Sequence, residues 1–198
     1  MSMQHKAFLF NTEVYYEQIE PIIESCCMTS DSGVVCEYIN NNLEQIYNPY
    51  TAENLEADWQ NELESGSMQE LFDFILTRCY EPDDDIGLEY SWDGVLEAIK
   101  EMNILDEAEA DICVLGRPLI YAGIEINPGL MGLGIVEAGE VKRIKDILTK
   151  NQEKLETIDI PEDLLYELDE AELIDAYDDL CTIYKRAVAE GKGLLFTF

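Results

Sequence analysis

The chain has 198 residues, 47% of them hydrophobic, and its 43 Asp and Glu against 12 Lys and Arg give a formal net charge of −31. The hydrophobic content excludes general disorder, and the length suits one domain over residues 1–198. The charge excludes nucleic acids and anionic membrane surfaces as partners by the usual electrostatic route, whereas it would speed encounter with a basic protein. No apolar run approaches the ~20 residues that a membrane-spanning helix needs.

Cysteine usage points to a reducing compartment. The six cysteines are an even number, but a disulfide framework is typical of short secreted chains, and no signal peptide is visible at the start of this sequence. We therefore expect free, mostly buried thiols in a cytoplasmic protein. The residues concerned are Cys26, Cys27, Cys36, Cys79, Cys113 and Cys181.

The first predicted elements are a strand and two helices. Residues 7–10 form a short apolar run typical of a strand. Asn11 or Thr12 is placed to cap a helix, in which Pro21 would introduce a kink or begin a second turn. A periodic stretch from Val35 to Ile46 predicts a further helix that residues 48–49 end.

Two more helices are expected before residue 80. Apolar residues recur every four positions from Leu55 to Leu63, and Gly66 stops that run. Ser67 and Glu70 have the spacing at which each side chain satisfies the other's free backbone donor. The broad apolar stripe over residues 68–79 then predicts an amphipathic helix.

The second half mixes helices with short strands. Residues 81–87 read as a loop, and a helix carrying Trp92 follows. The compact apolar runs at 112–115 and 119–121 predict strands, and helical spacing returns over 141–148. Pro161 suits the start of a short helix through Leu168.

The last elements are a long helix and a strand. Asp169 and Glu172 have the reciprocal capping spacing, and apolar periodicity continues to Val188 before Gly191. The apolar run 193–198 predicts a strand that pairs into the sheet. The fold class is therefore α+β, a helix-rich single domain with a small mixed or antiparallel sheet.

Three segments resemble the YfbM-like family of uncharacterised bacterial proteins. They are Ser91–Leu96, then Val114–Gly116 continuing through Gly132–Gly134 to Glu140–Val141, and Tyr177 to the end of the sequence. Arg117 departs from the family pattern, which has a second glycine at this place, and the N-terminal half of the sequence gives no clear match. The resemblance implies a single α+β domain and supplies neither an activity nor catalytic residues.

Motifs for catalysis, metals and cofactors are weak. His5 is the only histidine, and we expect it to be exposed and inert near the N-terminus. Cys26, Cys27 and Cys36 lack zinc-ligand spacing, and the acidic run before Glu89 lacks calcium-loop spacing. The Gly129–Gly134 loop does not have the dinucleotide fingerprint. We expect no resident metal or cofactor and identify no catalytic residue.

Three hypotheses for function remain. The preferred one is a non-enzymatic interaction protein that recognises a basic partner, as an immunity protein or a nucleic-acid mimic would. The second is a small-molecule-binding protein or enzyme with its site near Arg117 and the Gly129–Gly134 loop, and the third is a carboxylate-based metal enzyme. The candidate partner-binding residues are Tyr47, Tyr50, Asp83, Asp84 and Asp85, and the candidate ligand-binding residues are Arg117, Gly132 and Gly134.

Overall fold

The computed structural model describes residues 3–128, 132–159 and 164–198. The strands are β1 (Lys6–Phe10), β2 (Arg117–Pro118), β3 (Ile120–Tyr121), β4 (Ile124–Glu125), β5 (Leu133–Val136) and β6 (Gly193–Thr197). The α-helices are α1 (Thr12–Val14), α2 (Glu20–Thr29), α3 (Gly33–Asn41), α4 (Met68–Leu76), α5 (Trp92–Glu101), α6 (Glu107–Leu115), α7 (Ala138–Asn151) and α8 (Glu170–Glu190). A π-helical stretch, η1 (Tyr15–Ile19), joins α1 to α2, and the 3₁₀ segments are η2 (Leu43–Gln45), η3 (Trp59–Glu62), η4 (Thr77–Cys79) and η6 (Gln152–Thr157).

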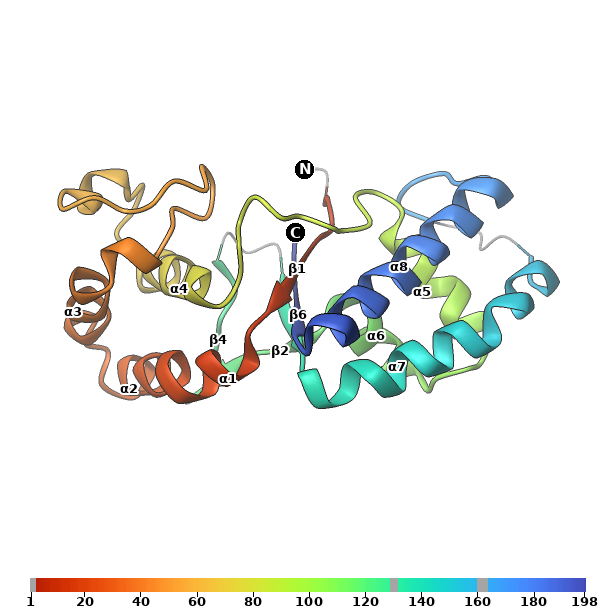
Figure 1. Cartoon of the computed structure of the whole chain (residues 1–198), viewed down its shortest axis with the longest axis horizontal. Helices are drawn as coiled ribbons and strands as arrows, with labels where there is room; N and C mark the ends of the chain where they lie inside the picture. The colour runs from red at the N-terminus through yellow and green to blue at the C-terminus, as the bar shows by residue number, and fades with distance from the viewer. Residues whose placement is uncertain (1–2, 129–131, 160–163) are drawn as a thin grey trace.

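A small antiparallel sheet lies in the middle of the molecule, with helices on both sides (Figure 1). Its strand order is β1-β6-β5-β2, and β3 and β4 form a separate two-stranded ribbon. The register of the β1–β6 pair runs from Lys6 opposite Thr197 to Phe10 opposite Gly193. These pairings confirm the α+β fold class, the antiparallel form of the sheet and the two strands expected near the ends of the sequence.

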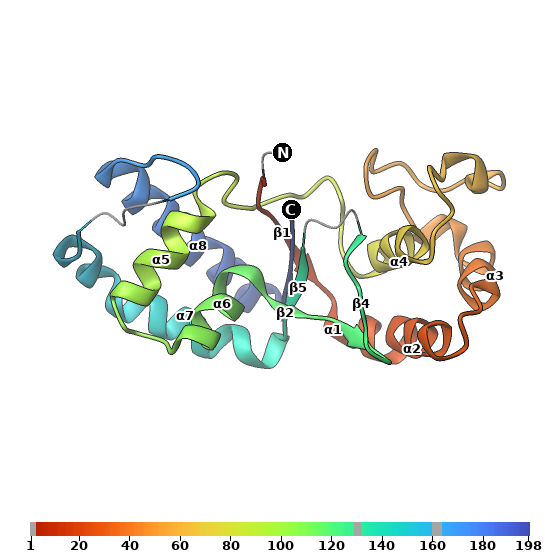
Figure 2. The same ribbon diagram turned by 180° about the vertical axis from the view of Figure 1, so that it is seen from behind.

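The two faces of the sheet belong to two different hydrophobic cores. Alternate residues of a strand point to opposite faces. Ala7 and its partner Phe196 join the core that α5–α8 build, whereas Phe8 and its partner Leu195 join the core that α1–α4 build. Seen from behind, the same two groups of helices flank the sheet (Figure 2). One thin sheet therefore supports two helical lobes.

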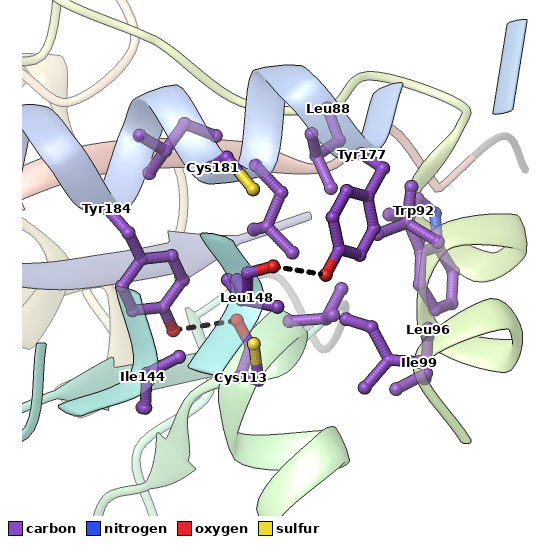
Figure 3. Close-up of a cluster of buried hydrophobic side chains, with 14 of the residues drawn as sticks. Leu88, Trp92, Leu96, Ile99, Cys113, Ile144, Leu148, Tyr177, Cys181 and Tyr184 are labelled. Atoms are coloured by element: carbon purple, nitrogen blue, oxygen red, sulfur yellow. Dashed lines mark hydrogen bonds between the residues drawn. The ribbon is translucent and has the colours of Figure 1, made fainter. Parts of the chain in front are cut away.

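Two buried tyrosines from α8 tie the core of the second lobe to the backbone (Figure 3). The hydroxyl of Tyr177 donates to the carbonyl of Leu148, at 3.0 Å, and the hydroxyl of Tyr184 donates to the carbonyl of Cys113, at 2.8 Å. A buried hydroxyl without a partner would cost free energy, so these bonds let large aromatic rings fill the core. They also fix α8 against α6 and α7.

The cap predictions hold with one difference. Asp169 and Glu172 form the reciprocal capping box of α8, and Gly191 ends that helix in the left-handed region, at φ 64°. Ser67 accepts from the amide of Glu70 as expected. The Glu70 carboxylate, however, accepts the amides of the preceding turn, residues 64–66, instead of the Ser67 amide.

The predicted helix over residues 55–63 is wrong. Only η3 forms there, because the Leu55 amide donates to the Ile46 carbonyl and Tyr47 bridges to Asn54, which holds the segment extended. The regularly spaced Leu55 and Trp59 are buried although no regular helix forms. The indole N–H of Trp59 donates to the Asn40 side chain. The helix expected over 35–46 likewise ends early, since α3 stops at Asn41.

The predicted strand at residues 112–115 is also wrong. These residues form the last turns of α6, which Asp106 caps by accepting from the amide of Glu109. The run is continuously apolar because Cys113 and Val114 face the core and the flanking residues pack against its edge. The expected helix from Pro161 begins outside the described residues, and residues 164–168 are not helical.

Candidate functional site

One lobe of the protein carries only negative charge. Residues 11–77, here called the acidic lobe, contain α1–α4 and the segments between them. They include fourteen Asp and Glu and no Lys or Arg. The remaining positive charges lie elsewhere, and four of them are on α7, namely Lys142, Arg143, Lys145 and Lys150. The charge of the chain is therefore unevenly distributed along its length.

The carboxylates of the acidic lobe are mostly open to solvent. Among the residues that the structure describes, none of the exposed ones forms an ion pair. A surface with one sign of charge attracts oppositely charged partners over about a Debye length, ~8–10 Å at physiological salt. The exposed acids are Glu13, Glu17, Glu24, Asp31, Glu37, Glu44, Glu53, Glu56, Asp58, Glu62 and Glu64.

Two large side chains of the acidic lobe are more than half exposed. Met28, at the end of α2, is 68% exposed, and Tyr50 is 70% exposed. Tyrosine and methionine are enriched at protein interfaces, where they supply apolar contact inside a polar rim. The acidic lobe thus combines long-range attraction with apolar contact points.

Tyr47 and Asp84 line a common cavity of about 410 Å³. It lies between β1, η4, the residues around η2 and the C-terminal end of α8. Asp84 accepts from both terminal nitrogens of Arg186 on α8, at 3.1 and 2.5 Å. Tyr47 is fixed by its amide, which donates to the Thr77 hydroxyl at 2.9 Å. The structure therefore places these two predicted partner-binding residues in the lining of one cavity.

Tyr50 and Gly132 line a second, smaller cleft of about 130 Å³. The Tyr50 hydroxyl donates to Asp73, at 3.1 Å, and Lys6 lies in the same cleft. Burial raises the pKa of the Asp73 carboxyl to about 6, although the Tyr50 hydrogen bond and the charge of Lys6 act in the opposite direction. Sequence reasoning missed Asp73, because it sits within an apolar helical stripe.

The predicted ligand-binding residues do not converge on one cavity. Arg117 is exposed and forms a two-pronged pair with Glu140, at 3.0 and 3.2 Å. Gly134 packs against the end of α6, where a Cβ would lie 2.3 Å from the Leu115 carbonyl oxygen. Residues 129–131 of the glycine loop lie outside the described residues.

The acidic run divides into different local roles. Asp83 is exposed, whereas Asp85 accepts from the amides of Ala7 and Gly87, at 3.1 and 2.9 Å. Asp85 thereby fastens the segment before α5 to β1. Of the three aspartates, Asp84 and Asp85 have intramolecular partners and Asp83 remains open to solvent.

His5 is fully buried, so the expectation that it is exposed is wrong. Its Nδ1 accepts from the Leu88 amide, at 3.1 Å, and its Nε2 donates to the Val114 carbonyl, at 2.8 Å. This pattern requires the neutral ring, and burial lowers the pKa of His5 to about 4. The residue holds β1, the 85–89 segment and α6 together, and its role is structural.

The thiols and the acids form no metal site in the described part of the chain. All six cysteines are free, and all but half-buried Cys36 are buried. Across residues 3–128, 132–159 and 164–198, no cluster of three His, Cys, Asp or Glu side chains could hold a metal ion. No helix in the same ranges is both long and apolar enough to cross a membrane.

The comparisons with known proteins found no matching family model, no matching curated protein and no matching solved structure.

Proposed function

We propose that the protein is a non-enzymatic interaction module whose acidic lobe recognises a basic protein. The observation that carries the proposal is the complete lack of Lys and Arg from residue 7 to residue 77, beside fourteen carboxylates. Charge of one sign concentrated on one lobe steers a partner of the opposite sign and orients its approach. An immunity protein or a nucleic-acid mimic would use such a surface, and neither would bind nucleic acid itself.

Two further features support this proposal. The exposed Met28 and Tyr50 of the acidic lobe offer apolar contact area to a partner. The alternative ligand site near Arg117 is less favoured, because Glu140 already occupies its guanidinium. Free and largely buried thiols suit a reducing compartment, and we place the protein in the cytoplasm. Its relation to the YfbM-like family remains a prediction.

The test compares two triple variants with equal changes of charge. Glu17→Gln/Glu24→Gln/Glu37→Gln neutralises the outer face of the acidic lobe, and Glu101→Gln/Glu153→Gln/Glu156→Gln neutralises three exposed acids of the other lobe. Immobilised wild-type protein and both variants are incubated with lysate at low salt and eluted with a salt gradient. We expect a basic protein to bind the wild type and the second variant, and to be lost from the acidic-lobe variant.

Duplex DNA added as a competitor separates the two kinds of partner. Release of the bound protein by DNA indicates that the acidic lobe occupies a nucleic-acid-binding surface, and retention indicates a different basic surface. Recovery of no salt-sensitive basic protein would reject the proposal. Equal recovery on both triple variants would also reject it, because total charge alone would then explain the binding.

A further inference from the structure

The cavity of about 410 Å³ contains positive charge in a strongly negative chain. Arg78 is the only Lys or Arg between residues 7 and 99, and it lines this cavity together with Lys192. Among the residues that the structure describes, neither side chain forms an ion pair. Both cations therefore remain available to an anionic ligand in the cavity.

Arg78 also has an unmet hydrogen-bonding requirement. Its Nε is buried and has no hydrogen-bond partner in the described structure. A buried donor without an acceptor is costly, and a bound ligand or an ordered water that accepts from it would remove that cost. Guanidinium groups present paired donors that match the oxygens of a carboxylate or a phosphate.

Arg78 and Lys192 act on the same region of the cavity. Both line the cavity together with Cys79, and burial raises the pKa of the Cys79 thiol to about 12 while the charges of both cations oppose that rise. Arg78 belongs to η4 and Lys192 to the turn between α8 and β6, so the cations come from segments far apart in the sequence. An anionic ligand in this cavity would meet positive charge from both segments.

The acids of the cavity wall fall into two classes. Asp84 and Glu190 are both paired with Arg186, which reduces their repulsion of an anion. Glu44 and Glu81 are exposed in the same wall and form no ion pair in the described part of the chain. They disfavour an anion of high charge and favour a ligand that also carries an ammonium group.

We propose that this cavity binds a small zwitterionic molecule, with its carboxylate or phosphate on Arg78 and Lys192 and its ammonium group toward Glu44 and Glu81. The cavity volume lies within the range of about 300–1,000 Å³ that small-molecule sites occupy. The site is distinct from the outer faces of α2 and α3 in the acidic lobe, so its existence does not depend on the proposed basic partner.

The experiment titrates four probes into ¹⁵N-labelled protein and follows the backbone amides and the arginine Nε–H signals. The probes are inorganic phosphate, phosphoethanolamine, acetate and β-alanine, which separate phosphate from carboxylate and test the added amine. Arg78→Gln and Lys192→Gln are the site variants, and Arg117→Gln is the matched control outside the cavity. Because the Arg78 Nε is buried, its proton exchanges slowly, and its signal is assigned by its loss in Arg78→Gln.

We expect saturable shifts around Thr77–Tyr80 and Lys192 with one of the two amine-bearing probes, and weaker binding of its amine-free counterpart. Each site variant should weaken binding by about tenfold or more, while Arg117→Gln binds as the wild type does. Lys192 is on a surface turn, so its variant remains informative if Arg78→Gln is poorly folded. Absence of saturable shifts with all four probes, or unchanged binding by Lys192→Gln, would overturn the proposal. Tighter binding of the amine-free probes would overturn the assignment of Glu44 and Glu81.

Discussion

Replacing His5 by glutamine removes a buried group whose ionisation links folding to pH. In the folded protein the pKa of His5 is about 4, compared with 6.5 for an ordinary histidine, because burial disfavours the charged ring. The unfolded chain therefore takes up a proton at a higher pH than the folded chain does. The contribution of His5 to stability is complete above about pH 6.5 and is lost as the pH falls toward about 4.

The size of this effect follows from the two pKa values. Between about pH 7.5 and about pH 5, protonation of the unfolded state removes about 2 kcal/mol of stability through His5 alone. Urea unfolding of the wild type and of His5→Gln at both pH values gives the difference in their free energies of unfolding. Subtracting one free energy of unfolding from the other at each pH cancels the contribution of the carboxylates, which both proteins share. We expect the advantage of the wild type to shrink by about 2 kcal/mol at the lower pH.

Asp73 provides a control of opposite sign. Its pKa is raised by burial to about 6 from an ordinary 3.8, so the folded chain takes up this proton before the unfolded chain does, and acidification stabilises the fold through Asp73. When the pH falls over the same interval, Asp73 should add about 1.4 kcal/mol to the stability of the wild type, and Asp73→Asn should lack this increase. A wild-type advantage over His5→Gln that stays constant with pH would refute the reasoning for His5, because the ring would then titrate alike in both states.

Three other predictions follow from local contacts. Glu70→Gln should destabilise the fold by about 2 kcal/mol in urea unfolding at neutral pH, because an amide cannot accept all the donors of residues 64–66 that now bind the carboxylate. Gly134→Ala should lower the free energy of unfolding by about 3 kcal/mol or prevent folding, since its Cβ would clash with the Leu115 carbonyl. Gly139→Ala is the control, and thermal melting should show it to be neutral or slightly stabilising, because the space around Gly139 is open. A thiol reagent should modify Cys36 first in the native protein, because the other thiols are buried, and fast labelling that persists in Cys36→Ser would contradict this burial pattern.

Local patterns in the sequence predict much of the fold. The strands of the sheet near residues 7–10 and 193–197 are found from apolar runs, and α4, α5 and α8 from periodicity and caps. The failures at 55–63 and 112–115 have one cause. A short apolar run reports burial, and burial is the same whether the backbone is helical or extended. Hydrogen bonds to distant residues, such as Leu55 to Ile46, decide the conformation.

The candidate sites are less accessible to sequence reasoning. The sequence alone shows that Arg78 is the only Lys or Arg between residues 7 and 99. Its place in one cavity with Lys192 depends on tertiary packing, which the sequence pattern does not reveal. The burial of His5 depends on contacts with Leu88 and Val114, more than eighty residues away along the chain. Such long-range contacts leave no local pattern, so the position of His5 near the start of the sequence suggested an exposed ring, whereas the structure buries it.

The central place of β6 in the sheet has a consequence for the order of folding. β6 lies between β1 and β5 in the sheet, although nearly the whole described sequence separates β1 from β6. Until β6 emerges from the ribosome, β1 lacks its partner, and the aromatic side chains of Phe8 and Phe10 lack one wall of their core. Both lobes should therefore reach their final stability together, only after β6 has been synthesised, because each core includes side chains of β6.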